Sequence, residues 1–302
     1  MSVKDLVKKI PGASGLYHKL KKRKPVTYID DNESSHQQLQ LMLLNQYREN
    51  FRNGHKPYAR IEEAGFRCYS QFEEDGIILY ILAAIGMPTR TVVEMCCGSG
   101  HECMAANLIL NHRYRGFLLD GDQVSIDAAT SFFASKKDCY MTPPVIRKAW
   151  ITKDNVNDLL RQMGASGEID LLSLDMDGND YWIWDAITEI NPRLCVFETH
   201  NLVPDDISVT IPYDPNFYCW SKKGDERDFR SVSLLAMKKL SESKGYRMIG
   251  AHRHGFNVFF LRNDLAQDLF PAVSIEDVHD NFWTHEQVKK WPKIKDMGWV
   301  EV

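Results

Sequence analysis

The segment TVVEMCCGSG at residues 91–100 decides the fold that the sequence predicts. Its first five residues are mostly β-branched or apolar, which is typical of a short buried strand, and Gly98 and Gly100 end that strand. A helical pattern follows from about residue 102 to residue 111. A strand, a glycine turn and a helix in this order form the first unit of a sheet in which helices connect parallel strands.

The same alternation continues through the next hundred residues. Further strands are expected at residues 116–120, 144–150, 169–175 and 193–198, and helices at 155–163, 182–190 and 233–243. Two last apolar runs, 246–249 and 258–261, are close enough in sequence to pair as an antiparallel hairpin. The sequence therefore predicts an α/β fold, a Rossmann-like, doubly wound sheet of seven strands that is mostly parallel and has helices on both faces.

The composition is that of a folded protein without a large excess of one charge. The chain has 302 residues, of which 44% are hydrophobic and 26% charged, and its net charge is −4. This balance excludes a disordered chain and disfavours one that wraps nucleic acid through bulk charge. No apolar run approaches the roughly 18 residues of a membrane span. The seven cysteines include no Cys-x-x-Cys pair, so we expect neither a zinc ribbon nor a disulfide framework, and the expected compartment is cytoplasmic.

Three regions are expected along the chain. Residues 1–68 form a basic leader and a helical N-terminal extension, and residues 69–262 form the main domain. Residues 263–302 form a C-terminal appendage that packs on the core or on a second subunit of a homo-oligomer. Residues 1–24 are rich in Lys and Arg, which indicates a solvated segment or, as the alternative, an arm that contacts an anionic surface such as a membrane or a charged glycan.

Acidic residues stand at the carboxyl ends of four expected strands. They are Glu94, Asp120, Asp175 and Glu198. Open α/β sheets bind ligands at that edge, where the strand order reverses, so these acids indicate a binding cleft. An acid about twenty residues after a glycine turn can accept the hydroxyls of a ribose, and Asp120 stands there, which favours an adenosine-containing ligand. The dinucleotide pattern Gly-x-Gly-x-x-Gly is incomplete because Cys103 replaces the third glycine, so an NAD-dependent enzyme ranks lower.

Residues 70–262 resemble the class I S-adenosylmethionine (SAM)-dependent methyltransferases and, within them, the FkbM-like family. The matching segments are YSQFEEDGI at 69–77, VVE at 92–94 with GSG at 98–100, AANL at 105–108, LDG at 119–121 and DLLSLDMDGNDY at 170–181. In one departure from the family pattern, Cys96 replaces the first glycine of the Glu-x-Gly-x-Gly loop. The resemblance also implies an antiparallel last strand.

The resemblance implies a cofactor site on the strand ends. Glu94, Gly98 and Gly100 would line the methionine and ribose part of SAM. Asp120, with Gly121 beside it, would bind the ribose hydroxyls. Trp150 and Ile151 would flank the adenine.

A second set of polar residues follows two neighbouring strands. The segment DMDGND at 175–180 packs three carboxylates into six residues, and its spacing does not fit an EF-hand loop. Oxygen ligands on two strand ends suit Mg²⁺ or a similar divalent cation, and the resemblance to metal-dependent O-methyltransferases suggests Asp175, Glu198 and Asn201 as ligands. In the alternative, these acids cap helix N-termini. Without a metal, Asp175 or His200 would be the general base.

These features together predict an enzyme. The resemblance implies a SAM-dependent O-methyltransferase that acts on a hydroxyl of a sugar, a glycan or a glycosylated small molecule. The aromatic, proline-containing insert at residues 202–231 is interpreted as a substrate lid, or alternatively as a packing flap or a dimer contact. The alternative function is a non-catalytic adenosine-binding or assembly protein on the same fold. A nucleic-acid substrate ranks low, because an Asn/Asp-Pro-Pro-Tyr-like motif and a basic groove are not found in the sequence.

Overall fold

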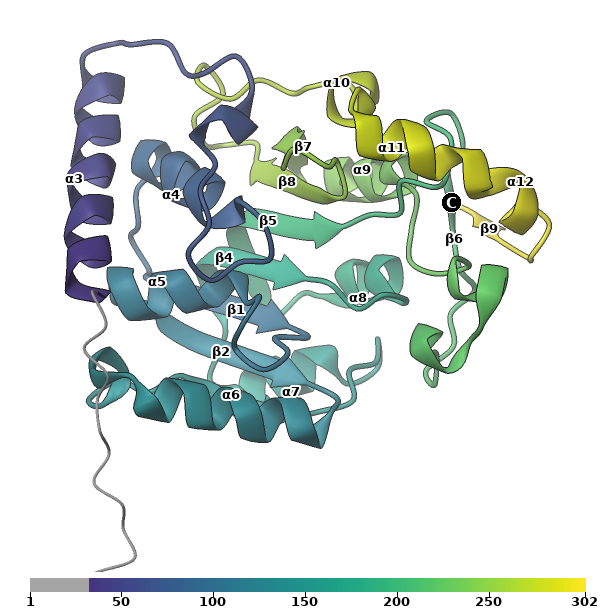
Figure 1. Ribbon diagram of the computed structural model, residues 1–302, viewed down its shortest axis with the longest axis horizontal. Coiled ribbons are helices and arrows are strands. Elements are labelled where there is room, and N and C mark those ends of the chain that lie inside the picture. Colours follow the sequence, from purple (N-terminus) through teal and green to yellow (C-terminus); the bar gives the residue numbers. More distant parts are fainter. Residues whose placement is uncertain (1–32) are drawn as a thin grey trace, which may run out of the picture.

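The computed structural model describes residues 33–302 (Figure 1). The basic leader expected at residues 1–24 lies outside the described residues, and so does its proposed contact with an anionic surface. Among the helices between Glu33 and Val302, none has the length and apolar content that crossing a membrane requires.

A seven-stranded sheet forms the centre of the fold. Its strands are β1 (Thr91–Met95), β2 (Arg115–Asp120), β3 (Val145–Lys148), β4 (Gly167–Leu174), β5 (Ile190–Glu198), β7 (Tyr246–Ala251) and β8 (Asn257–Arg262). Their order is β3-β2-β1-β4-β5-β8-β7. The first five strands pair in parallel, and β8 runs antiparallel to both β5 and β7. This confirms the predicted doubly wound, mostly parallel sheet with its antiparallel last strand.

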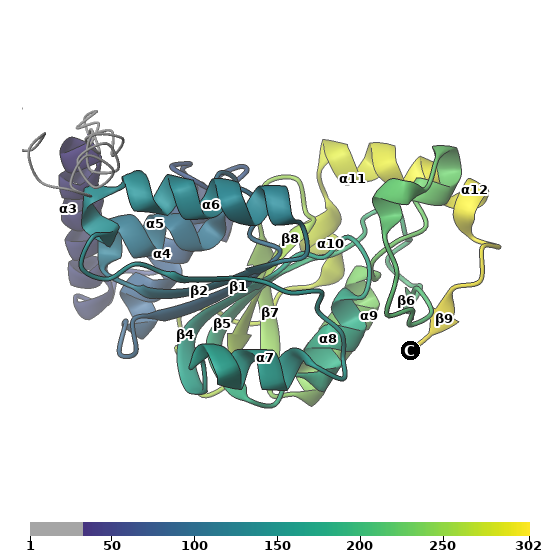
Figure 2. The same ribbon diagram turned by 90° about the horizontal axis from the view of Figure 1, so that it is seen from below.

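Helices cover both faces of the sheet. One face carries α4 (Glu74–Ile85), α5 (Met104–His112) and α6 (Gln123–Ser135), and the other carries α7 (Val156–Met163), α8 (Asp180–Ala186) and α9 (Leu234–Ser243). Figure 2 shows these two layers on opposite sides of the strands. The N-terminal helix α3 (Glu33–Arg52) packs against α4, on the side of the sheet where the parallel strands begin (Figure 1).

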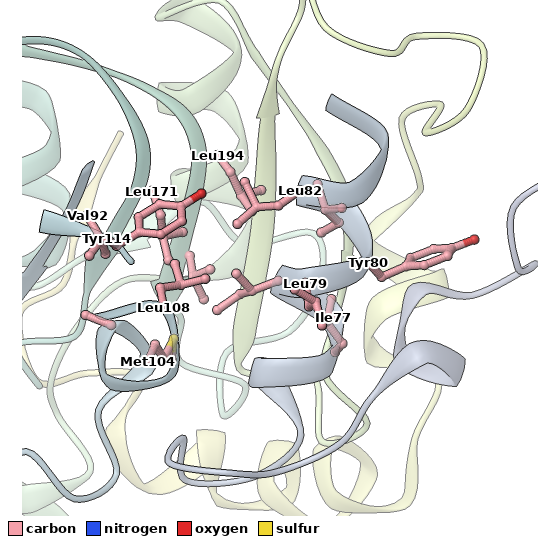
Figure 3. Close-up of a cluster of buried hydrophobic side chains, with 14 of the residues drawn as sticks. Ile77, Leu79, Tyr80, Leu82, Val92, Met104, Leu108, Tyr114, Leu171 and Leu194 are labelled. Carbon is pink, nitrogen blue, oxygen red and sulfur yellow. The ribbon is translucent and has the colours of Figure 1, made fainter. Parts of the chain in front are cut away.

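The core alternates along the central strands because both of their faces are buried. In β1, Val92 belongs to the cluster beneath α4 and α5, whereas Val93 belongs to the cluster beneath α7 and α8. Figure 3 shows the first cluster, in which Leu79 and Leu82 of α4 lie near Leu171 and Leu194 of the strands. Burying such a side chain fully stabilises the fold by about 1.5–3 kcal/mol, so the two clusters fix the register of the helices on the sheet.

Some elements differ from the sequence-based prediction. The helix expected at 182–190 ends at Ala186, and Ile190 already begins β5. The Asn157 side chain accepts hydrogen bonds from the backbone N–H groups of Thr188 and Glu189, which holds this stretch outside the helix. The helices α4 and α6 were not predicted from the sequence. Ten of the twelve residues of α4 are buried, so it lacks the one-sided apolar stripe that identifies a helix in a sequence.

The segment 202–231 and the C-terminal region fold together. The segment contains β6 (Val209–Thr210) and the short 3-10 helices η3 (Cys219–Ser221) and η4 (Gly224–Arg227). The C-terminal region contains α10 (Ile275–His279), α11 (Phe282–Gln287), η5 (Val288–Lys290), α12 (Trp291–Ile294) and β9 (Val300–Glu301). Strand β9 pairs antiparallel with β6. Figures 1 and 2 place most of these elements together beyond the end of the sheet to which β4 and β5 point, whereas α10 packs beside β7.

Candidate active site

A cavity of about 480 Å³ lies at the carboxyl ends of β1 to β4. We call it the first cavity. Four residues that the sequence assigned to cofactor binding line it, namely Asp120, Gly121, Trp150 and Ile151, and Asp175 lines it too. The strand order reverses between β1 and β4, because the chain proceeds from β1 outward to β3 and then crosses to β4. The first cavity therefore lies at the point where open α/β sheets bind ligands.

The glycine turn is bonded to Asp120. The backbone N–H of Gly98 donates to Asp120 Oδ2 at 2.9 Å, and that of Asp122 donates to Oδ1 at 2.8 Å. The N–H groups of Cys96 and Cys97 both donate to the Leu119 carbonyl. These bonds fix the carboxylate of Asp120 at the rim of the cavity. Each of its oxygens can accept one further hydrogen bond from a ligand.

Glu94, Gly98 and Gly100 do not line the first cavity, and Glu94 and Gly100 have structural positions. Glu94 accepts hydrogen bonds from the backbone N–H groups of Met104 at 3.0 Å and Ala105 at 2.6 Å, and from the Cys103 thiol at 3.1 Å. It thus caps the first turn of α5. Its side chain is buried on the same face of β1 as Val92, two residues earlier, and burial raises the pKa of Glu94 to about 7.

Gly98 and Gly100 both have positive φ angles, of +55° and +82°. A Cβ atom on Gly100 would lie 2.9 Å from the Phe132 ring, so this glycine permits close packing of the turn on α6. A Cβ atom on Gly98 would meet nothing closer than 4.0 Å, so the space beside Gly98 is open. Of the two glycines, Gly98 is the one with room for a ligand.

Cys96 stands in the left-handed conformation, at a φ of +67°, and lines the first cavity. This is the position at which the family pattern has glycine, and its backbone conformation explains why glycine suits it. Burial, followed by the charges of Asp120 and Asp175, raises the pKa of the Cys96 thiol well above its ordinary value. The thiol therefore remains protonated and serves as a wall of the cavity.

Three carboxyl groups meet at the ends of β4 and β5. Oxygen atoms of Asp175, Asp177 and Glu198 all lie within 4.8 Å of one another. Burial, and next the charge of Asp177, raises the pKa of Asp175 to about 7, and burial beside Asp175 raises the pKa of Glu198 well above its usual range. Asp175 and Glu198 are hydrogen-bonded to each other. This pair therefore holds one shared proton near neutral pH.

Asp177 is bonded to the segment 202–231. The Arg230 guanidinium forms an ion pair with Asp177, with 2.8 Å between Nη1 and Oδ1, and the Trp220 indole N–H donates to Oδ2 at 3.1 Å. Asp177 itself has a positive φ of +52°. Individual roles for Asp177, Trp220 and Arg230 were not predicted from the sequence, because these contacts join residues more than forty positions apart.

The three predicted metal ligands are only partly brought together. Asp175 and Glu198 are adjacent, whereas the Asn201 amide donates to the His254 carbonyl at 3.2 Å and to Thr284 Oγ1 at 3.1 Å. The three carboxylates would suit a hard cation. In this arrangement, however, the Arg230 guanidinium is already paired with Asp177, and Asp175 and Glu198 are hydrogen-bonded to each other. A divalent cation would have to replace both interactions, so the site as built does not fit one.

His200 is buried, and its Nε2 atom lies 2.5 Å from the Asp228 carbonyl oxygen. Because a carbonyl only accepts, Nε2 must carry the proton. Burial, followed by the charge of Arg230, lowers the pKa of His200 to about 3. The imidazole is therefore neutral and weakly basic, and Asp175 is the better placed of the two predicted bases.

The segment 202–231 closes over the first cavity. Phe217, Tyr218 and Trp220 line it. The Trp150 indole N–H donates to the Pro215 carbonyl at 2.6 Å, and Phe217 lies so close to Gly178 that a Cβ atom there would be 2.6 Å from its ring. The segment thus contacts both the expected adenine side of the cavity and the loop that follows β4.

A second cavity, of about 500 Å³, lies next to the carboxyl end of β5. Glu198, His200 and Asn201 line it. Phe72, which precedes α4, and Trp283, in α11, line it too. The two cavities therefore flank the three carboxyl groups, with Asp175 and Asp177 on one side and Glu198 on the other.

No protein-family model matches this sequence, and no curated protein matches it either. Solved structures with a similar fold are SAM-dependent methyltransferases. An O-methyltransferase from Bacillus cereus in complex with S-adenosylhomocysteine (SAH) is 10% identical over 74% of this chain and 89% of its own, with a TM-score of 0.41. The N-terminal domain of EvdMO1 with SAH bound is 11% identical over 73% and 95%, with a TM-score of 0.43. The magnesium protoporphyrin IX methyltransferase of Synechocystis PCC 6803 with bound SAM is 9% identical over 83% and 92%, with a TM-score of 0.36. Membership of the FkbM-like family stays a prediction.

Proposed function

We propose that this protein transfers the methyl group of SAM to a hydroxyl oxygen of a sugar, a glycan or a glycosylated small molecule. The observation that supports this most is the first cavity, which is lined both by Asp120, bonded to the turn at Gly98, and by the carboxyl groups of Asp175 and Asp177 that follow β4. The resemblance of the sequence to class I methyltransferases assigns the same residues to SAM.

The residues of the first cavity fit SAM chemically. Asp120 would accept the ribose hydroxyls with the lone pairs that its two backbone donors leave free. The Trp150 indole is 48% exposed and offers an aromatic face to adenine. Asp175 and Asp177 place negative charge at the other side of the cavity, which suits a sulfonium. When bound, SAM supplies an electrophilic methyl group.

Methyl transfer requires a base as well as a methyl donor. As the new O–CH₃ bond forms, the S–CH₃ bond breaks and SAH is released. The proton of the acceptor hydroxyl passes to the hydrogen-bonded pair of Asp175 and Glu198: Glu198 takes it up as its own proton moves to the carboxylate of Asp175. Positioning of the acceptor oxygen in line with the S–CH₃ bond supplies most of the remaining acceleration. No step of this reaction needs a metal.

Calorimetry with SAH and, separately, with NAD⁺ tests the proposal. We expect SAH to bind and NAD⁺ to fail, and we expect Asp120→Asn to weaken SAH binding by about tenfold or more, because it removes a charged acceptor. Asp127→Asn is the matched control, since Asp127 is an exposed acid on α6. Binding of NAD⁺ without SAH would overturn the proposal. Binding of SAH without methyl transfer to any hydroxyl would instead favour a non-catalytic adenosine-binding protein.

A further inference from the structure

The second cavity adjoins the first across the three carboxyl groups. Two pairs of side chains connect the cavities. Asp175 of the first cavity is hydrogen-bonded to Glu198 of the second, and Asp177 of the first is 2.8 Å from Arg230 of the second. A hydroxyl group in the second cavity beside Glu198 is therefore next to the shared proton and next to the end of the first cavity that suits the sulfonium.

One wall of the second cavity is aromatic. The ring centroids of Phe72 and His254 are 4.9 Å apart, those of Phe72 and Phe256 are 5.7 Å apart, and those of His254 and Trp283 are 6.5 Å apart. Phe72 precedes α4, His254 and Phe256 lie in the β7–β8 turn, and Trp283 lies in α11. His254 is half-buried in this wall.

Polar side chains also line the second cavity. Gln287 and Lys290 of the C-terminal region line the cavity together with Asp228 and Arg230 of the segment 202–231. Lys290 Nζ is 3.7 Å from Asp228 Oδ2, which is too long for a strong hydrogen bond and leaves both groups able to bond a ligand. An aromatic wall opposite several hydrogen-bonding groups fits a ring that has an apolar face and several hydroxyls on its edge.

We propose that the second cavity binds the acceptor, that this acceptor is a sugar ring, and that the C-terminal helix α11 with Lys290 selects it. The ring's apolar face would pack on Trp283 and His254, its hydroxyls would bond Gln287 and Lys290, and one hydroxyl would point to Glu198. A simple phenol fits less well, since it would leave most of these polar groups without a partner. The sugar's role as methyl acceptor rests on the proposed function, whereas its binding here does not.

Saturation-transfer NMR with methyl and 4-nitrophenyl glycosides, recorded without SAM, tests the binding site directly. We expect signals from at least one glycoside and about three- to tenfold weaker binding to Trp283→Ala and Lys290→Ala. Phe282→Ala and Lys289→Ala are matched controls, because Phe282 is 79% exposed and neither residue lines the cavity. Trp283→Phe should restore most of the binding, which separates loss of the aromatic face from misfolding.

The outcomes distinguish this inference from the proposed function. No signal from any glycoside, or equal binding by Trp283→Ala and Phe282→Ala, would overturn the inference even if SAH binds. Binding of 3,4-dihydroxybenzoate but of no glycoside would overturn the sugar assignment. Failure of SAH to bind in calorimetry, with glycoside binding intact and sensitive to Trp283, would remove the proposed function and leave the sugar site standing. In an active enzyme, Trp283→Ala should raise the KM for the glycoside and leave SAH affinity unchanged.

Discussion

At the scale of single residues, the carboxyl pair of Asp175 and Glu198 sets the pH range of the reaction. Burial raises the pKa of Asp175 to about 7, so the pair can accept the acceptor's proton only above that pH. We therefore predict that kcat increases as the pH rises past about 7 and then reaches a plateau. Asp175→Asn should lower kcat by about 10²–10⁴-fold and leave SAH affinity nearly unchanged. A pH profile of initial rates checks this, and a rate that is flat from pH 5 to 8 would contradict it.

The ion pair between Arg230 and Asp177 leads to a separate prediction about metal binding. In Arg230→Met, Asp177 loses its counter-charge, and the three carboxyl groups become free to hold a cation. We predict that Mn²⁺, followed by electron paramagnetic resonance, binds to Arg230→Met at least about tenfold more tightly than to the unmodified protein. Arg227→Met is the control, since Arg227 lies over the Trp220 ring and not on Asp177. Tight Mn²⁺ binding by the unmodified protein, with activity lost in EDTA, would instead support the predicted metal site.

At the scale of elements, Glu94 connects β1 to α5. In Glu94→Gln, the amide nitrogen would face the N–H groups of Met104 or Ala105, so at least one buried donor loses its acceptor. We predict that the free energy of unfolding falls by about 1–3 kcal/mol. Urea denaturation measures this, with Glu49→Gln on the exposed side of α3 as the control. An unchanged midpoint would show that the cap contributes little.

Strand β1 and its neighbours show how much of the fold and of the site the sequence predicts. The strands, their parallel pairing and the position of Asp120 follow from apolar runs that end in an acid or a glycine. The prediction that the Glu94 side chain lines the cofactor site did not consider the side-chain alternation along β1. That alternation places Glu94 on the same face as Val92, and hence toward α5. The contacts of Trp220 and Arg230 with Asp177 depend on how an irregular segment folds back, and no local pattern encodes that.

At the scale of the whole molecule, the C-terminal strand fastens the segment 202–231 over the site. Strand β9 pairs with β6, and the backbone N–H of Val302 donates to the Ser208 carbonyl at 3.2 Å. Trp299 packs edge-on against Phe229, with 4.6 Å between ring centroids, and lies 6.4 Å from the His200 ring. None of these contacts involves a strand of the seven-stranded sheet, and of residues 298–302 only Val302 packs against a core cluster. We therefore expect closure of the site and stability of the core to be separable.

Removal of residues 298–302 should therefore open the site without unfolding the sheet. We predict faster trypsin cleavage after Lys222, Lys223 or Arg227, all of which lie in the segment 202–231, because the segment loses its paired strand and the Trp299 contact. The far-UV circular dichroism should stay nearly unchanged, because Val302 is the one residue of 298–302 that packs against a core cluster, and it is only half-buried there. Mass spectrometry of timed digests identifies the cleavage sites. Trp291→Ala, which removes a neighbouring ring and leaves β9 in place, is the control. Equal cleavage of the truncated and full chains would show that Trp150 and Asp177 hold the segment closed without help from the C-terminal strand.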